Sequence, residues 1–123
     1  MKRPSETAPT MSEFEQGLLT GLLIGEGSFT GDGKAAELVV KMHIRHERLL
    51  RWLHGLFPRT KLYGPYEHGG RHYFMWIARG RALKEDVLPT LHRISEFDDH
   101  AAARLDLMVT RYGLDQVSAK SAA

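Results

Sequence analysis

Residues 18–29 read Leu-Leu-Thr-Gly-Leu-Leu-Ile-Gly-Glu-Gly-Ser-Phe, an apolar run punctuated by glycine that contains one carboxylate, Glu26. With Gly17 just upstream, Gly21 and Gly25 recur at every fourth position, so in a helix they would share one face. A glycine inside a helix costs about 1 kcal/mol relative to alanine. Three on one face need a physical reason, and the close approach of another backbone supplies one.

A helix start precedes this run. Ser12-Glu13-Phe14-Glu15 has the pattern of a capping box, in which the side chains of Ser12 and Glu15 each accept a hydrogen bond from the other residue's backbone N–H. We therefore predict a helix over residues 13–25.

Downstream of Ser28 the period of the apolar residues changes to two. Over residues 37–45, Leu38, Val40, Met42 and Ile44 alternate with polar and mostly basic positions, which is typical of a half-buried strand. The Gly-Asp-Gly-Lys segment at 31–34 is a turn signal, so residues 28–30 are predicted to pair with this strand as a hairpin.

A helix is predicted over residues 46–57, ending before Pro58. A second hairpin is predicted from residues 59–66 and 71–79. Placing Phe74, Trp76 and Ala78 inward leaves Met75 and Ile77 on the polar outer face. Either these two face outward beside the basic residues, or the strand is one residue out of register.

Two further helices complete the pattern. Residues 83–94 are predicted to be helical with an interruption at Pro89, and Asp98 or Asp99 is predicted to cap a last helix that ends at Arg111 before Gly113. Residues 12–113 would form a single domain, with a disordered tail over 1–11 and a frayed one over 114–123.

Charge is unevenly distributed although the net charge is only +2. Residues 34–81 contain ten lysines and arginines but three glutamates, which is typical of a nucleic-acid-binding surface and is also found on ordinary basic surfaces. The absence of cysteine excludes disulfides and thiol catalysis. The longest apolar run is too short to span a membrane, and no signal peptide is evident, so we expect a cytoplasmic location.

The stretch over residues 19–29 resembles the defining motif of the LAGLIDADG homing endonucleases, including the Gly-Ser-Phe that opens the first strand. The order of elements and the Trp-Ile-Ala-Arg-Gly segment at 76–80 fit the same family. The resemblance implies an α+β fold of order α-β-β-α-β-β-α-α with a four-stranded antiparallel saddle that binds DNA. With one motif per chain it implies a homodimer, whose interface would include Gly17, Leu18, Gly21, Leu22 and Gly25.

The resemblance also implies that the concave face of the sheet reads double-stranded DNA at a pseudo-palindromic site. No small-molecule substrate is expected. The predicted DNA-binding residues share basic or aromatic side chains on or near that face: Lys34, Lys41, His43, Arg45, Arg59, Lys61, Tyr63, Arg71, Tyr73 and Arg79.

The implied chemistry is metal-dependent phosphodiester hydrolysis. The Glu26 carboxylates of two subunits, with DNA phosphates and the Gly25 carbonyl, would hold Mg²⁺ or another divalent cation. His46 matches a position where the family often keeps a polar residue that orders water in the active site. The alternative is that His46 only starts the following helix.

Two departures from the family leave a second hypothesis open, and the first is Ile24 in place of the motif's first acidic residue. Active members often place a lysine near the scissile phosphate, in the loop before the last helix, whereas residues 94–99 here read Ile-Ser-Glu-Phe-Asp-Asp. A cation that stabilises the transition state would therefore be absent or supplied by Arg93 or Arg45. The alternative is a dimeric, regulatory DNA-binding protein that has lost catalysis. An RNA-binding role ranks third, and zinc sites at His43 with His46 or His68 with His72 lack a third ligand.

Overall fold

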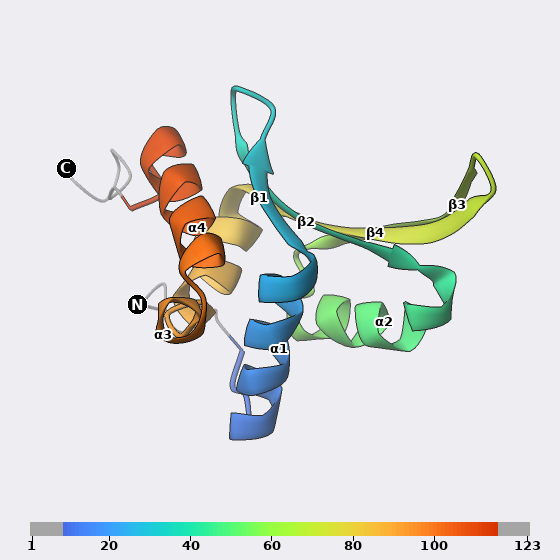
Figure 1. Ribbon diagram of the computed structural model, residues 1–123, viewed down its shortest axis with the longest axis horizontal. Coiled ribbons are helices and arrows are strands. Elements are labelled where there is room, and N and C mark those ends of the chain that lie inside the picture. Colours follow the sequence, from blue (N-terminus) through green and yellow to red (C-terminus); the bar gives the residue numbers. More distant parts are fainter. Residues whose placement is uncertain (1–8, 116–123) are drawn as a thin grey trace.

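The computed structural model of the chain describes residues 9–115. Helix α1 (Glu13–Glu26) leads into strands β1 (Gly27–Gly31) and β2 (Ala36–His43), and helix α2 (Glu47–Leu56) leads into strands β3 (Lys61–His68) and β4 (Arg71–Arg79). The four strands form one antiparallel sheet in the order β1-β2-β4-β3. Figure 1 shows α1 and α2 on one side of a curved sheet. The predicted α+β class and strand pairing are confirmed.

The capping box predicted for α1 is present. The backbone N–H of Glu15 donates to Ser12 Oγ at 3.1 Å, and the backbone N–H of Ser12 donates to Glu15 Oε1 at 3.2 Å. At the other end the N–H of Gly27 donates to the carbonyl of Leu23 as the chain turns into β1. The helix is therefore fixed at both ends, and its last residue is Glu26.

The sheet presents alternate residues to its two faces, and one face is covered by the helices. Its inward side chains join those of α1 and α2 in a single core, which includes Leu19, Leu23, Leu38, Val40, Leu50, Leu53, Phe74 and Trp76. The register pairs Val40 with Trp76 and Val39 with Ile77. Met75 and Ile77 therefore lie on the other face, which we call the open face, and the alternative register is excluded.

Two strands differ from the predicted ranges. β2 ends at His43, and residues Ile44–His46 form a 3₁₀ turn, so Arg45 does not lie in the strand as predicted. β3 begins at Lys61, so Arg59 precedes it.

β3 also contains an irregularity that changes which side chains share the open face. Tyr63 pairs with Met75 and Tyr66 with Tyr73, so β3 has one extra residue between the two pairs. The extra residue falls at Gly64 and Pro65, where proline has no N–H to contribute to the ladder. After this bulge Tyr66 and His68 take the places that strict alternation would give to Pro65 and Glu67.

The segment after β4 departs most from prediction. In place of a helix over 83–94, the chain forms a π-helical segment, η3 (Ala82–Val87), and a 3₁₀ turn, η4 (Leu88–Thr90), that contains Pro89. Ile94 starts rather than ends a helix, the single turn α3 (Ile94–Phe97). The last helix, α4 (Asp99–Tyr112), is as predicted: the Asp98 carboxylate accepts from the Ala101 N–H at 2.7 Å, and Gly113 closes it with φ of 64°.

Of the predicted tails, residues 1–8 and 116–123 lie outside the described residues. Met11 and Leu114, at the predicted domain limits, are partly buried against the core. Within residues 9–115 no helix is long and apolar enough to cross a membrane.

Candidate functional site

Glu26 is an exposed carboxylate at the end of α1, between Gly25 and Gly27. Within residues 9–115 its side chain makes no hydrogen bond or ion pair, whereas Glu15 and Glu37 are both engaged. The backbone N–H of Ser12 and then the indole of Trp52 lower the pKa of Glu15 by hydrogen bonding to its charged form. Glu26 has no such partner in the described chain, so its oxygens are available to a ligand.

The three glycines of α1 point away from the core. A Cβ added at Gly17, Gly21 or Gly25 would meet no atom within 4 Å among the described residues. Phe14 and Leu18 flank them, with 78% and 36% of their surface exposed. We call this surface the glycine face. Of the residues predicted for an interface, Leu22 does not belong to it, because its side chain is buried in the chain's own core.

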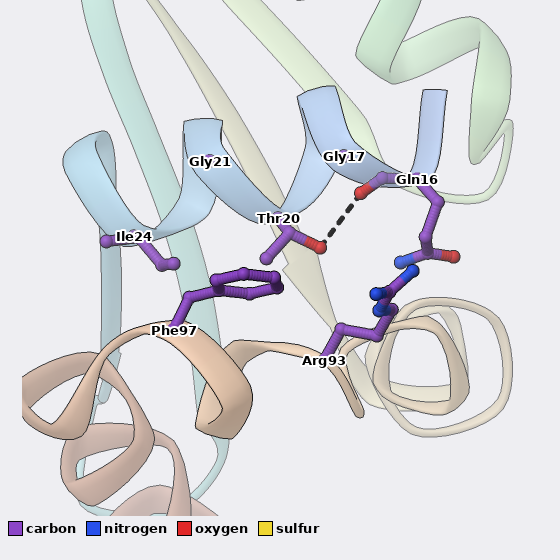
Figure 2. A pocket seen from close by; sticks show the side chains of 7 residues that line it. All are labelled: Gln16, Gly17, Thr20, Gly21, Ile24, Arg93 and Phe97. Carbon is purple, nitrogen blue, oxygen red and sulfur yellow. Dashed lines mark hydrogen bonds between the residues drawn. The ribbon is translucent and has the colours of Figure 1, made fainter. Parts of the chain in front are cut away.

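A hollow of about 280 Å³ lies between the glycine face and α3. It is lined by Gly17 and Gly21 from α1 and by Arg93 and Phe97 from the segment around α3, and Figure 2 shows the Phe97 ring directed toward α1. Phe97 is 68% exposed. Sequence reasoning missed this residue, because only the fold brings it beside α1.

The open face is basic and aromatic. The predicted residues that lie on it, as judged from the register, are Lys41, His43, Lys61, Tyr63, Arg71, Tyr73 and Arg79. The Lys41 ammonium lies 4.8 Å from the centre of the Tyr73 ring, and the Tyr66 and Tyr73 rings are 5.5 Å apart. Arg79 is paired with Glu37 at 3.0 Å. Tyr66 and His68 were missed because the bulge in β3 reverses the alternation.

His43 and Arg45 form a local unit at the end of β2. The backbone N–H and the Nε–H of Arg45 both donate to His43 Nδ1, at 3.0 and 3.2 Å. These bonds require an unprotonated Nδ1. Burial, followed by the positive charges of Arg45, His46 and His72, lowers the pKa of His43 below its usual range.

Two other predicted DNA-binding residues lie off the open face. Arg59 donates to both carboxylate oxygens of Asp86 at 2.8 Å and to Glu85 at 2.9 Å. Its guanidinium is therefore held by ion pairs within the chain. Lys34 is exposed in the turn between β1 and β2.

The structure does not bring together the residues predicted to act with Glu26. Gly27 pairs with Val40, so the end of β2 lies three residues, or about 10 Å, further along the strand, and His46 lies in the turn beyond it. Arg93 contacts Glu13 at 3.5 Å, at the opposite end of α1, which is about 20 Å long. Neither His46 nor Arg93 makes a hydrogen bond or ion pair with Glu26 in the described structure.

The donor atoms near Glu26 suit a hard cation but are few. Exposed carboxylate and backbone carbonyl oxygens are the ligands that Mg²⁺ prefers. Residues 9–115 contain no group of three or more acidic, histidine or cysteine side chains that could hold a metal.

The fold resembles that of a solved structure described as the group I intron-encoded homing endonuclease I-CeuI complexed with DNA, with a TM-score of 0.72 and 17% sequence identity. The match covers 86% of this chain and 57% of that chain, so this chain spans little more than half of its length. No model of a known protein family matches the sequence, and no curated protein matches it significantly. The structural match alone shows that the chain has a homing-endonuclease-like fold.

Proposed function

We propose, from this fold, that the chain is one subunit of a homodimeric, divalent-cation-dependent double-strand DNA endonuclease of the homing type. The observation that carries the proposal is the position of Glu26. It is a carboxylate without a partner among residues 9–115, at the end of the helix that presents the glycine face. Two such helices packed side by side would place two Glu26 carboxylates next to each other.

The glycine face supports the dimer. Within residues 9–115 no other side chain or backbone atom fills the space beside its glycines, although each costs helix stability relative to alanine. Phe14, Leu18 and Phe97 add apolar surface around it. The hollow between α1 and Phe97 offers a place for side chains of a second copy. A twofold axis along α1 would give an isologous interface.

The open face supports DNA as the partner. Its lysines and arginine would contact phosphates, and its tyrosines and histidines offer donors to base edges or packing against sugars. The curvature of β3 and β4 in Figure 1 gives this face a concave shape. In a twofold dimer two such faces would lie along one duplex, which favours a pseudo-palindromic site.

The chemistry would be assembled from both subunits and the DNA. Glu26, the Gly25 carbonyl, a second Glu26 and phosphate oxygens would hold a divalent cation such as Mg²⁺, which when bound would supply an activated water and stabilise the leaving oxygen. The protein's own contribution is to place these carboxylates at the centre of the bound duplex. His46, in the turn after β2, would order water around the bound DNA and forms no hydrogen bond with Glu26 of its own chain in the described structure.

The test is to incubate the purified chain with a library of duplexes, with and without Mg²⁺. We expect double-strand cuts only with the metal, and their loss in Glu26→Gln with binding retained. Glu13→Gln, which changes an exposed glutamate at the other end of α1, is the matched control and should still cut. Binding without cutting on every duplex would favour the DNA-binding protein that has lost catalysis. Cutting by Glu26→Gln would refute the role of Glu26.

A further inference from the structure

A polar cleft of about 320 Å³ lies at the junction of α1 and β1. Ile24 at the end of α1 and Gly27 and Ser28 at the start of β1 form one wall, and His100 and Arg104 of α4 form the other. Glu26 itself does not line the cleft, but Ile24 before it and Gly27 after it do. Figure 1 shows α4 running beside β1, so the fold brings these distant segments together.

His100 and Arg104 are four residues apart on α4 and therefore lie on the same side of that helix. Both are exposed, and neither makes a hydrogen bond or ion pair within the described part of the chain. The acids of the preceding loop do not reach them: Asp98 caps α4, and Glu96 pairs with Arg93. Arg104 is therefore an arginine of this cleft that has no internal partner among the described residues.

The basic surface continues from this cleft along the free edge of the sheet. β1 is an edge strand, and a second cleft beside it is lined by Thr30 and Gly31 on one side and by Arg104 and Arg111 on the other. Arg111 stacks on Tyr112 at 5.4 Å. Arginines spaced along an edge suit the repeated phosphates of a polynucleotide better than a single small anion.

We propose that Arg104, with His100 beside it, binds a backbone phosphodiester of the DNA at the junction of α1 and β1, the segment that contains Glu26. The guanidinium would donate two hydrogen bonds to one phosphate, a geometry that also favours the extra negative charge formed during hydrolysis. This cation comes from within the last helix. The resemblance to the family implies instead a lysine in the loop before that helix. The inference rests on the proposed function, because it takes DNA as the ligand.

The test compares Arg104→Gln with Arg48→Gln, which removes an exposed arginine on α2 that lines neither cleft. For a duplex selected by the wild-type chain, we expect Arg104→Gln to reduce the slope of log K against log salt by about 0.9 per subunit. Where the wild type cuts, it should also slow cutting of the bound duplex by about 100-fold, with partial recovery in Arg104→Lys. Arg48→Gln should change neither quantity beyond a small shift in affinity.

The outcomes separate this inference from the proposed function. A wild-type chain that binds DNA without cutting would refute the nuclease while the salt slope still tests Arg104. A chain that cuts, with Arg104→Gln matching Arg48→Gln in both slope and rate, would refute only the role of Arg104. A chain that binds no duplex would refute both. Equal melting temperatures of Arg104→Gln and Arg48→Gln would establish that a loss of folding does not cause the change in salt slope or cutting rate.

Discussion

At the scale of single residues, Arg59 shows how burial decides the role of a charge. The Asp86 side chain is only 5% exposed, and the two hydrogen bonds from Arg59 satisfy both of its oxygens. Those bonds, with that to Glu85, raise the pKa of Arg59 above its ordinary value. In the sequence Arg59 is one of many basic residues of the middle segment, and nothing nearby indicates a partner 27 residues away.

We predict that Arg59→Met lowers the melting temperature by roughly 5–10 °C, because a buried carboxylate loses its cation. The measurement is thermal unfolding followed by circular dichroism. Arg81→Met, which removes only a surface pair with Glu85 at 3.8 Å, should change the melting temperature by less than about 2 °C. Equal effects of the two variants would contradict the buried-pair explanation.

His43 leads to a prediction about pH. Its lowered pKa means that it is neutral near pH 7 in the free protein, and a nearby phosphate would favour its protonated form. Binding of DNA should therefore take up protons, and affinity should rise as pH falls from about 8 to 6. Protonation would also release Arg45 from Nδ1. The folding stability of the free protein should change in the opposite direction, because the folded state favours neutral His43. That contribution to stability is lost as pH falls through the folded-state pKa of His43.

The measurement is the affinity for a selected duplex across that pH range at constant salt. His43→Gln should flatten the dependence, whereas His92→Gln, an exposed histidine that lies outside the sheet, should leave it unchanged. An unaltered slope in His43→Gln would show that another group takes up the proton.

At the scale of elements, α1 and the sheet followed from local patterns. The capping box predicted the start of the helix, and the alternation in β2 and β4 predicted which side chains enter the core, because these patterns are local. The register of β4 stayed open in the sequence, because its partner β2 lies about 35 residues away along the chain. The bulge in β3 and the π-helical segment η3 were missed, since they depend on how the chain fits around the core.

For α1, we predict that Ser12→Ala lowers the free energy of unfolding by about 1 kcal/mol, because the Glu15 N–H loses its acceptor. Denaturant unfolding measures this directly. Ser95→Ala changes an exposed serine in α3 and should have little effect. Hydrogen bonding lowers the pKa of Glu15 in the folded protein. The stability that ionised Glu15 contributes should therefore be lost as pH falls through this folded-state pKa. A Ser12→Ala variant as stable as wild type would mean that solvent replaces the cap at no cost.

At the scale of the whole molecule, sequence indicated the site but could not complete it. Glu26 and the glycine face could be predicted from the motif, because both lie within one helix. Phe97, His100 and Arg104 could not, because they lie beside α1 only after the last two helices have packed. Arg104, the basic residue that we propose in place of the loop lysine, lies within α4, where helix geometry decides which elements it faces.

The proposed dimer gives the sharpest prediction at this scale. Because no described atom lies within 4 Å of a Cβ at Gly21, Gly21→Leu should fold normally, and leucine is a better helix former than glycine by roughly 0.5–1 kcal/mol. Its bulk would keep two α1 helices apart, so sedimentation velocity should show a monomer with an unchanged or higher melting temperature. Gly55→Leu is a matched control, since Gly55 is an exposed helical glycine of α2 with equally open surroundings, and it should remain dimeric. If Gly21→Leu is also dimeric, the subunits meet elsewhere, and Glu26 would then have no second carboxylate beside it.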